Sequence, residues 1–367
     1  MTLRPRQTGP PGTFDPATRT GVGQAVEADP TEEATVSTLP VPMEDVRTVI
    51  ELAGLAPSVH NTQPWHFAWD GTALEVREDP ARALPVIDPT GRERVLSCGA
   101  AVLHAELALS RLGWAHTTTL LPHGEDDEVL ALLEVTGRRQ GTAREHDLAD
   151  AVALRTTDRD PYSDLAVPPA VLDALRVAAE TEQAWLRTVS ADRDEVDVQV
   201  LLAHADALQR ADPAYLAELA AWRTEAGSTG VPTRGLPQVP AEERASSLAL
   251  RDFDAGAAQS QPARGVHEDP PPAEHPTVVV IGTSGDSRRN WLEAGRATAR
   301  VLLSATVEGV AAQPLSAVLE VPATRARLRN ALGVVGHPQM VLRLGYGSRG
   351  PVSKRLPIGD VLDVVDS

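Results

Sequence analysis

The chain has 367 residues, and its 42% of hydrophobic residues are ample for a packed core. It carries 34 lysines and arginines against 51 aspartates and glutamates, and the resulting net charge of -17 disfavours nucleic acid or an anionic membrane as a partner. Its one cysteine, Cys98, excludes an internal disulfide, and without a membrane-length apolar run or an export signal we expect a cytoplasmic protein.

Residues 1–40 are expected to form a flexible leader, because they are rich in Pro, Gly, Thr and acidic side chains and show no hydrophobic periodicity. A helix pattern follows from Val46 to Leu55. It stops at Ala56, since the residue before a proline is pushed out of the α region. The chain should therefore leave its first helix on irregular backbone at Pro57.

The irregular stretch after this helix is polar. Ser58, Asn61 and Gln63 place a hydroxyl and two amides where they can face a ligand. A planar heteroaromatic ligand with ring carbonyls and ring nitrogens suits such a mixed set of donors and acceptors. The alternative is a helix end followed by a polar turn, with Trp65 and Phe67 as core anchors.

Two segments, Arg94–Gly113 and Asn290–Gly309, share a long helix pattern at a separation of 196 residues. Each has a glycine in its second turn, Gly99 or Gly295, and each stops at another glycine fourteen residues later. The early glycine predicts a close approach to another helix, because it has no side chain to keep the backbones apart.

Each of these helices is followed by a β-like segment that ends in glycine, Val129–Gly137 or Gln339–Gly347. The repeated order indicates a duplicated unit whose copies pack about a pseudo-two-fold axis. We therefore place a first half at 41–147 and a second half at 148–367. Within the second half, the segment at about 226–276 is dense in Gly, Pro and acidic residues, and it is interpreted either as a lid or as a plain surface excursion.

The second half opens with a basic segment. Arg155 and Arg159 lie four residues apart, with Thr157 between them. On a helical turn these three side chains would gather on one side and cradle a phosphate monoester. Charge pairing on an exposed helix is the alternative, and the spacing alone favours it.

Three later segments carry further candidate ligand-binding motifs. Gly309–Ser316 follows the second long helix, although an ordinary helix-to-strand connection has the same pattern. Lys354 and Arg355 supply two cations in a C-terminal loop, where Lys354 could be merely solvated. Gly345–Gly350 fits G-x-G-x-x-G, but prolines follow and too few residues remain for a βαβ unit. The ten histidines show no metal-binding spacing, so we assign no metal site.

The run from Pro57 to Trp65 resembles the flavin-contacting segment of the FMN-dependent nitroreductase superfamily. Its Ser-x-His-Asn-Thr-Gln-Pro-Trp version, together with Ser97–Ala101, is similar to the Acg family of actinobacterial proteins. The resemblance extends from about residue 44 to the C-terminus, with a gap between about 225 and 275. It implies an α+β fold with a mainly antiparallel central sheet flanked by helices, internally duplicated as a dimer fused into one chain.

The resemblance also implies one FMN per chain, held by residues of both halves, and a monomeric chain whose two halves form a pseudo-dimer. In the family's pattern the flavin ring is contacted by the residues that match Pro57, Ser58, Asn61 and Gln63, and the phosphate or ribityl chain is held by those that match Arg155, Thr157 and Arg159. The residues that match Gln313, Pro314 and Leu315 lie against the ring near N5, and those that match Lys354 and Arg355 reach the phosphate.

The activity that the resemblance implies is electron transfer from NAD(P)H to an organic acceptor such as a quinone or a nitroaromatic. The flavin carries this chemistry, so no side chain is assigned as a catalytic acid or base. The alternative is an FMN-binding protein with a lid-blocked site, which stores, sequesters or senses flavin without turnover. Flavin-assisted dehydrogenation or dehalogenation is a weaker third hypothesis.

Overall fold

The computed structural model describes residues 40–189, 193–224, 227–232, 276–347 and 350–365. The predicted leader at 1–40, apart from its last residue, lies outside this set. So does nearly all of the predicted lid. No helix within the described residues is long and apolar enough to cross a membrane.

The helices and strands expected from the sequence are present, with small shifts at their ends. The first half contains α1 (Met43–Gly54), η1 (Val59–Asn61), β1 (Trp65–Trp69), β2 (Ala73–Glu78), η2 (Pro80–Arg82), α2 (Arg92–Arg111), β3 (Trp114–Leu120), β4 (Val129–Arg138) and α3 (Ala143–Val152). The second half contains α4 (Pro169–Thr181), β5 (Trp185–Thr188), α5 (Arg193–Arg210), α6 (Pro213–Ala221), β6 (Arg223–Thr224), β7 (Val231–Pro232), β8 (Thr277–Thr283), α7 (Arg288–Val307), β9 (Ala311–Pro314), α8 (Ala317–Glu320), α9 (Pro322–Leu332), β10 (His337–Gly345), η5 (Ile358–Asp360) and β11 (Leu362–Val364).

Two sheets carry the fold. The first has the strand order β11-β1-β2-β4-β3, and the second has the order β5-β8-β10-β9. All neighbouring strands in them are antiparallel except β1 and β11, which are parallel. The predicted α+β class with mainly antiparallel pairing is confirmed, and each half builds a sheet of its own.

The last strand of the chain completes the sheet of the first half. Phe67 of β1 is paired with Leu362 of β11, and Trp69 is paired with Val364. Residues 350–365, called the C-terminal strap below, therefore leave the second half and return to the first. This return ties the two halves together at the level of the backbone.

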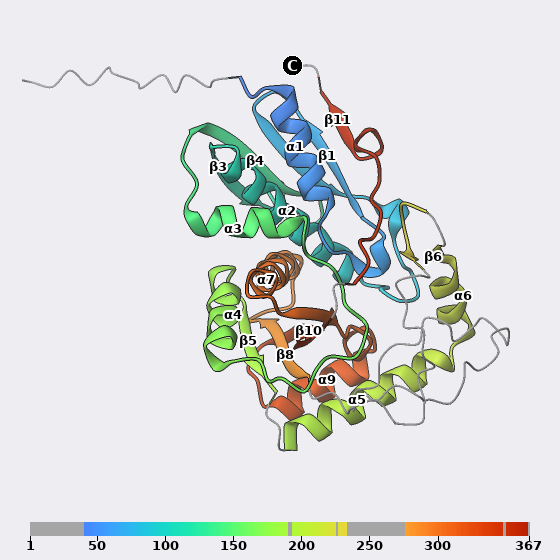
Figure 1. Cartoon of the computed structure of the whole chain (residues 1–367). Helices are drawn as coiled ribbons and strands as arrows, with labels where there is room; N and C mark the ends of the chain where they lie inside the picture. Colours follow the sequence, from blue (N-terminus) through green and yellow to red (C-terminus); the bar gives the residue numbers. More distant parts are fainter. Residues whose placement is uncertain (1–39, 190–192, 225–226, 233–275, 348–349, 366–367) are drawn as a thin grey trace, which may run out of the picture. The chain divides into compact units, whose positions relative to one another are not determined.

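Helices α2 and α7 lie between the two sheets (Figure 1). Helix α2 is buried along nearly its whole length, from Arg92 to Ser110, because it packs on the first sheet and on α7 at once. Helices α5, α8 and α9 pack on the second sheet, where Leu202 and Leu328 meet Val341 of β10 in one apolar cluster. The resulting order of layers is sheet, helices, sheet, helices.

The contact between α2 and α7 has two-fold symmetry. A Cβ atom on Gly99 would lie 2.3 Å from the carbonyl oxygen of Leu292, and one on Gly295 would lie 2.0 Å from that of Leu96. Both glycines and both leucines are separated by 196 residues, so each helix makes the same contact on the other. The predicted close approach is confirmed, and its reciprocity is what a duplicated unit requires.

Arginines at the start of the two helices also make reciprocal contacts. Arg92 of α2 donates to the carbonyl oxygen of Gln339 on β10, at 2.8 Å. Arg288 of α7, again 196 residues later, donates to Glu78 on β2, at 2.7 Å. A side chain from each half therefore bonds to the sheet of the other half, and these contacts fix the position of the two halves relative to each other.

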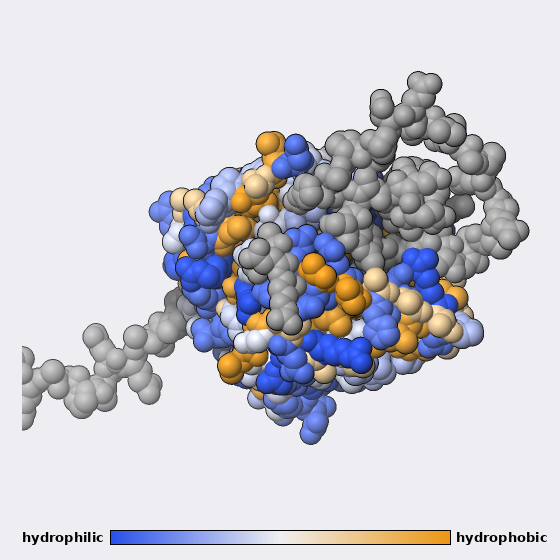
Figure 2. Space-filling view, turned by 90° about the horizontal axis from the view of Figure 1, so that it is seen from below, coloured by the Kyte–Doolittle hydropathy of each residue, from blue (hydrophilic) through white to orange (hydrophobic). Residues whose placement is uncertain are grey.

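The surface formed by α5 mixes apolar and polar side chains. Figure 2 looks at the molecule from the side of α5 and α9 and shows hydrophobic patches among hydrophilic ones. Val196 and Val200, one helical turn apart on α5, are 58% and 60% exposed. Single apolar residues of this kind are ordinary on a protein surface and identify no partner.

Candidate functional site

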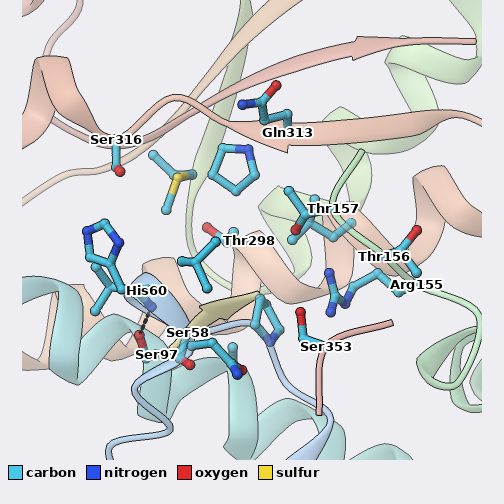
Figure 3. A pocket seen from close by; sticks show the side chains of 18 of the residues that line it. Ser58, His60, Ser97, Arg155, Thr156, Thr157, Thr298, Gln313, Ser316 and Ser353 are labelled. Carbon is cyan, nitrogen blue, oxygen red and sulfur yellow. Dashed lines mark hydrogen bonds between the residues drawn. The ribbon is translucent and has the colours of Figure 1, made fainter. Parts of the chain in front are cut away.

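A cavity of about 160 Å³ opens where the two halves meet. Residues of η1 and α2 line it from the first half, and residues of α7, β9 and the chain after α3 line it from the second. Figure 3 shows Arg155, Thr156 and Ser353 toward one end and His60 and Ser316 toward the other. The cavity thus has one cationic end, and polar side chains line both of its ends.

Ten of the twelve residues predicted from the sequence line this cavity. Gln63 and Lys354 do not belong to the lining. The ten that the fold brings together are Pro57, Ser58, Asn61, Arg155, Thr157, Arg159, Gln313, Pro314, Leu315 and Arg355.

The loop at 57–63 has an unusual backbone. His60, Asn61 and Gln63 have φ angles of 46°, 55° and 53°, in the left-handed region that favours glycine. Conformations of this kind cost on the order of 1–3 kcal/mol each and need support from their surroundings. Ser58 gives part of that support, since its hydroxyl accepts the backbone N–H of Gln63 at 3.0 Å. The loop is therefore held in a fixed shape against the cavity.

The two amides of this loop hold other parts of the chain. Asn61 donates to the carbonyl oxygens of Gly230 and Lys354, at 3.1 and 3.2 Å. Gln63, almost fully buried, accepts the backbone N–H of Leu356 at 2.9 Å. The amides thus fasten the β7 segment and the C-terminal strap to the first half, which is why the side chain of Gln63 does not face the cavity.

Arg155 is a cation without a counterion. Its Nε is buried and has no hydrogen-bond partner, and within the described residues its guanidinium forms no ion pair. Burial lowers the pKa of Arg155 to about 10. The segment 155–159 has no regular secondary structure, so the helical turn considered from the spacing is excluded, and with it charge pairing along a helix. Within the described residues Arg155 is therefore a charge without an acidic partner.

Arg355 lies near Arg155 but is bonded differently. Its Nε donates to the carbonyl oxygen of Gly54, at 2.8 Å, and its two Nη atoms donate to the carbonyls of Leu55 and Ala56 and of residues 353 and 354. These bonds commit the five N–H groups of the guanidinium. Burial, and then the charge of Arg155, lower the pKa of Arg355 to about 9.

His104 of α2 lies behind these two arginines. Its Nδ1 donates to the carbonyl oxygen of Leu52, at 3.2 Å, and its Nε2 is buried without a partner. Burial, and then the charge of Arg155, lower the pKa of His104 to about 3. The imidazole is therefore neutral at pH 7, with its proton on Nδ1.

Gln313 lies on the edge strand β9 of the second sheet, and not in a turn. Its Oε1 accepts the Nε–H of Arg343, its neighbour across on β10, at 2.6 Å. Arg343 is fully buried and also donates to the carbonyl oxygen of Asp160, at 2.8 Å, while its guanidinium lies 4.1 Å from the ring of Tyr162. Arg343 thus ties the segment that carries Arg155 to the second sheet, a role that no local sequence pattern indicated.

Several polar residues of the lining were missed from the sequence. Ser97 and Thr298 belong to the duplicated helices, where a polar residue inside a long apolar pattern was the available signal. The hydroxyl of Ser97 accepts the backbone N–H of Val59 at 3.2 Å (Figure 3), which fixes the loop above α2. The others are Thr156, Ser316, Ser353, His60 and Glu93.

The position related to this cavity by the pseudo-two-fold axis is filled. A shift of 196 residues places Arg296 where the cavity has Ala100, and relates Leu302 of the lining to Glu106. Arg296 donates to Glu106 at 2.7 Å and to Glu182 at 2.6 Å. An ion-pair network thus stands where a second cavity would need small and apolar side chains.

Within the described residues, no group of three or more His, Cys, Asp or Glu side chains could hold a metal ion. Cys98, the single cysteine, is buried, and burial raises its pKa well above the ordinary value. It is therefore a core residue and an unsuitable nucleophile.

The family model described as "Nitroreductase family" matches residues 36–87 and 152–346. A Mycobacterium tuberculosis protein named "Putative NAD(P)H nitroreductase" is 38% identical over 307 residues, which cover 83% of this chain and 85% of that protein. The chain belongs to the nitroreductase family. The family predicted from the sequence is thereby confirmed.

Other members of the nitroreductase family are more distant. The M. tuberculosis protein named acg is 28% identical over 326 residues, covering 87% of this chain and 95% of that protein. A crystal structure described as the FMN-dependent nitroreductase NfnB from Mycobacterium smegmatis in complex with NADPH is 15% identical. It covers 58% of this chain and 96% of its own, with a TM-score of 0.36.

Proposed function

We propose that the protein is an FMN-dependent oxidoreductase that transfers electrons from NAD(P)H to an organic acceptor such as a quinone or a nitroaromatic. The observation that carries the proposal is Arg155, a cation with a buried Nε and no counterion among the described residues, at the end of a cavity between the two halves. A buried charge of this kind is costly unless a partner arrives, and the phosphate of FMN is a suitable one.

The cationic end of the cavity fits a phosphate monoester. The hydroxyls of Thr156, Thr157 and Ser353 line it together with Arg155. Hydroxyls complement a guanidinium around phosphate oxygens, because they donate hydrogen bonds without adding charge. Arg355 supplies a second positive charge, although its N–H groups are committed to backbone carbonyls.

The rest of the cavity fits a flat ring. Leu96, Ala100 and Leu302 line it with apolar side chains, while Ser58 and Asn61 line it from the rigid loop. Bound FMN supplies the redox chemistry, accepting a hydride equivalent from NAD(P)H and passing its electrons to the acceptor. The chain's own residues bind the cofactor, fix the orientation of its ring and exclude water from one side of it.

The relatives support this choice of cofactor and donor. Two M. tuberculosis relatives are named for NAD(P)H, and the M. smegmatis structure is described as FMN-dependent and in complex with NADPH. Since the chain spans 85% of the 38% identical relative, which is named for NAD(P)H, the same electron donor is proposed here.

Anaerobic mixing of the FMN-loaded protein with NADPH or NADH tests the proposal. The visible absorbance of the oxidised flavin should bleach, and it should return when a benzoquinone is added. A protein that binds no FMN, or whose reduced flavin is not reoxidised when the acceptor is added, would contradict an electron-transfer role.

A second function, storage or sensing of FMN without turnover, is favoured by one observation. Val231 lines the cavity, and its segment is fastened to the first half by the bonds of Asn61 to Gly230 and of Gln63 to the carbonyl oxygen of Ser228, the latter at 2.7 Å. A cover fastened in this way restricts access of nicotinamide to the ring. Persistent yellow colour in excess NADPH and NADH would favour this second function.

A further inference from the structure

The C-terminal strap and the cationic end of the cavity share one residue. Arg355 belongs to the strap, lines the cavity and donates to the last carbonyl groups of α1. Cations at the C-terminus of a helix are stabilised by its dipole as well as by hydrogen bonds. Arg355 is therefore the latch that fastens the strap to the first half.

The strap has further fastenings on the same side of the first half. The backbone N–H of Leu356 donates to Gln63, and the carbonyl oxygen of Val361 accepts the backbone N–H of Phe67, at 2.7 Å. Strand β11 then adds its ladder to β1, and the N–H of Val365 donates to the first sheet at 2.8 Å. Each of these bonds uses a backbone N–H group as its donor, so hydrogen exchange can report how often it opens.

Arg355, the latch residue, is repelled by the positive charge of Arg155, which lines the same cavity. The repulsion disfavours the charged form of Arg355. The Nε of Arg155 is buried and both side chains are only partly exposed, so water screens this repulsion less than it would at an open surface. Arg355 can escape it by leaving the carbonyls of α1, whereas Arg155 is held by a segment tied to the second sheet through Arg343.

We propose that anion occupancy beside Arg155 controls the docking of the C-terminal strap, so that the phosphate of the cofactor closes the latch that helps retain it. The proposal rests on the proposed function for the identity of the anion, an FMN phosphate. By linkage the effect is reciprocal: whatever the anion adds to the docking of the strap, the docked strap adds to the affinity for the anion.

Hydrogen exchange of strap peptides, followed by mass spectrometry on the full chain, tests the proposal. Strap amides should exchange about fivefold or more slowly when FMN is bound, a factor at the low end of ordinary coupling between sites. Inorganic phosphate at saturation should slow them as well, compared with chloride at equal ionic strength. Riboflavin, which has the ring and lacks the phosphate, should leave them unchanged. Peptides of β8 serve as the internal reference.

A variant tests the latch without any ligand. Arg155→Met removes the repulsion, so the strap of the cofactor-free variant should exchange about fivefold or more slowly than that of the unmodified chain. Arg47→Met removes an equal charge from an exposed position on α1 and should change nothing. Equal exchange in Arg155→Met and the unmodified chain would overturn the proposal.

The proposed cofactor and the proposed control of the strap can be refuted separately. Flavin fluorescence on the same samples reports whether FMN binds, and a lack of binding would refute the proposed cofactor while leaving the Arg155→Met comparison valid. Protection of the strap by riboflavin to the same extent as by FMN would assign the effect to the ring and would refute control by the anion.

Discussion

Substituting Gly295 by alanine should destabilise the protein through the contact between α2 and α7. The added Cβ would lie 2.0 Å from the carbonyl oxygen of Leu96, whereas ordinary contacts begin at 3.4 Å, so about 1.4 Å of space is missing. The obstacle is backbone, so no side chain can turn away to relieve it. Overpacking costs about 3 kcal/mol at the upper end, and the better helix propensity of alanine returns about 1 kcal/mol. We expect a net loss of about 2 kcal/mol.

Urea unfolding followed by circular dichroism gives the measurement. Gly99→Ala should behave like Gly295→Ala, because its Cβ would lie 2.3 Å from the carbonyl oxygen of Leu292 in the symmetry-related contact. Gly54→Ala is the matched control, since this helical glycine has nothing within 4 Å of an added Cβ. If Gly295→Ala unfolds at the same urea concentration as Gly54→Ala, the reciprocal packing of the two helices is not what holds the halves together.

Three other predictions concern charge. Arg155→Ala should weaken FMN binding roughly ten- to a hundredfold, with riboflavin little changed, because a charge-assisted contact is worth about 1.5–3 kcal/mol. In the same fluorescence titration Arg47→Ala, which removes an exposed charge on α1, should affect neither ligand. As the pH drops from about 6 toward 4, the free energy of unfolding should fall more steeply in the unmodified chain than in His104→Gln, by about 1.4 kcal/mol per pH unit. The reason is that His104 binds a proton in the unfolded chain, whereas in the folded chain its pKa of about 3 keeps it neutral. Parallel stability profiles of the two proteins would contradict this. Arg296→Ala should lower the free energy of unfolding by about 3 kcal/mol, because it leaves the carboxylate of Glu106 without its ion-pair partner. Calorimetry of this variant should still find one FMN per chain, and a second bound flavin would show that the position related to the cavity by the pseudo-two-fold axis can be opened.

The sequence was sufficient for the elements that depend on local patterns. The α2 and α7 helices and the glycines where they cross were predicted because apolar periodicity and an early glycine are local features of each segment. The return of β11 to the first sheet could not be predicted in the same way, since a three-residue strand has no periodicity and its partner lies at the other end of the fold. Long-range pairing of this kind is decided by tertiary packing.

The site shows the same division between local and distant information. The segments that line the cavity were predicted through the family resemblance, because residue types and spacing alone left the alternatives open. Neither source predicted the direction of each side chain. Gln63 turns toward the strap because its backbone has a positive φ, and Arg355 spends its donors on α1 because the strap passes that helix end. The helical turn considered for Arg155 and Arg159 is absent, and its place is taken by an irregular segment fixed by a distant buried arginine, Arg343.

Titration calorimetry of the cofactor-free protein with FMN and with riboflavin tests the central claim most directly. The account predicts one FMN per chain, bound at least tenfold more tightly than riboflavin, since Arg155 should contribute about 1.4 kcal/mol or more through the phosphate alone. Binding of two FMN molecules per chain would contradict the single site. Equal affinity for FMN and riboflavin would contradict the role assigned to the buried arginine.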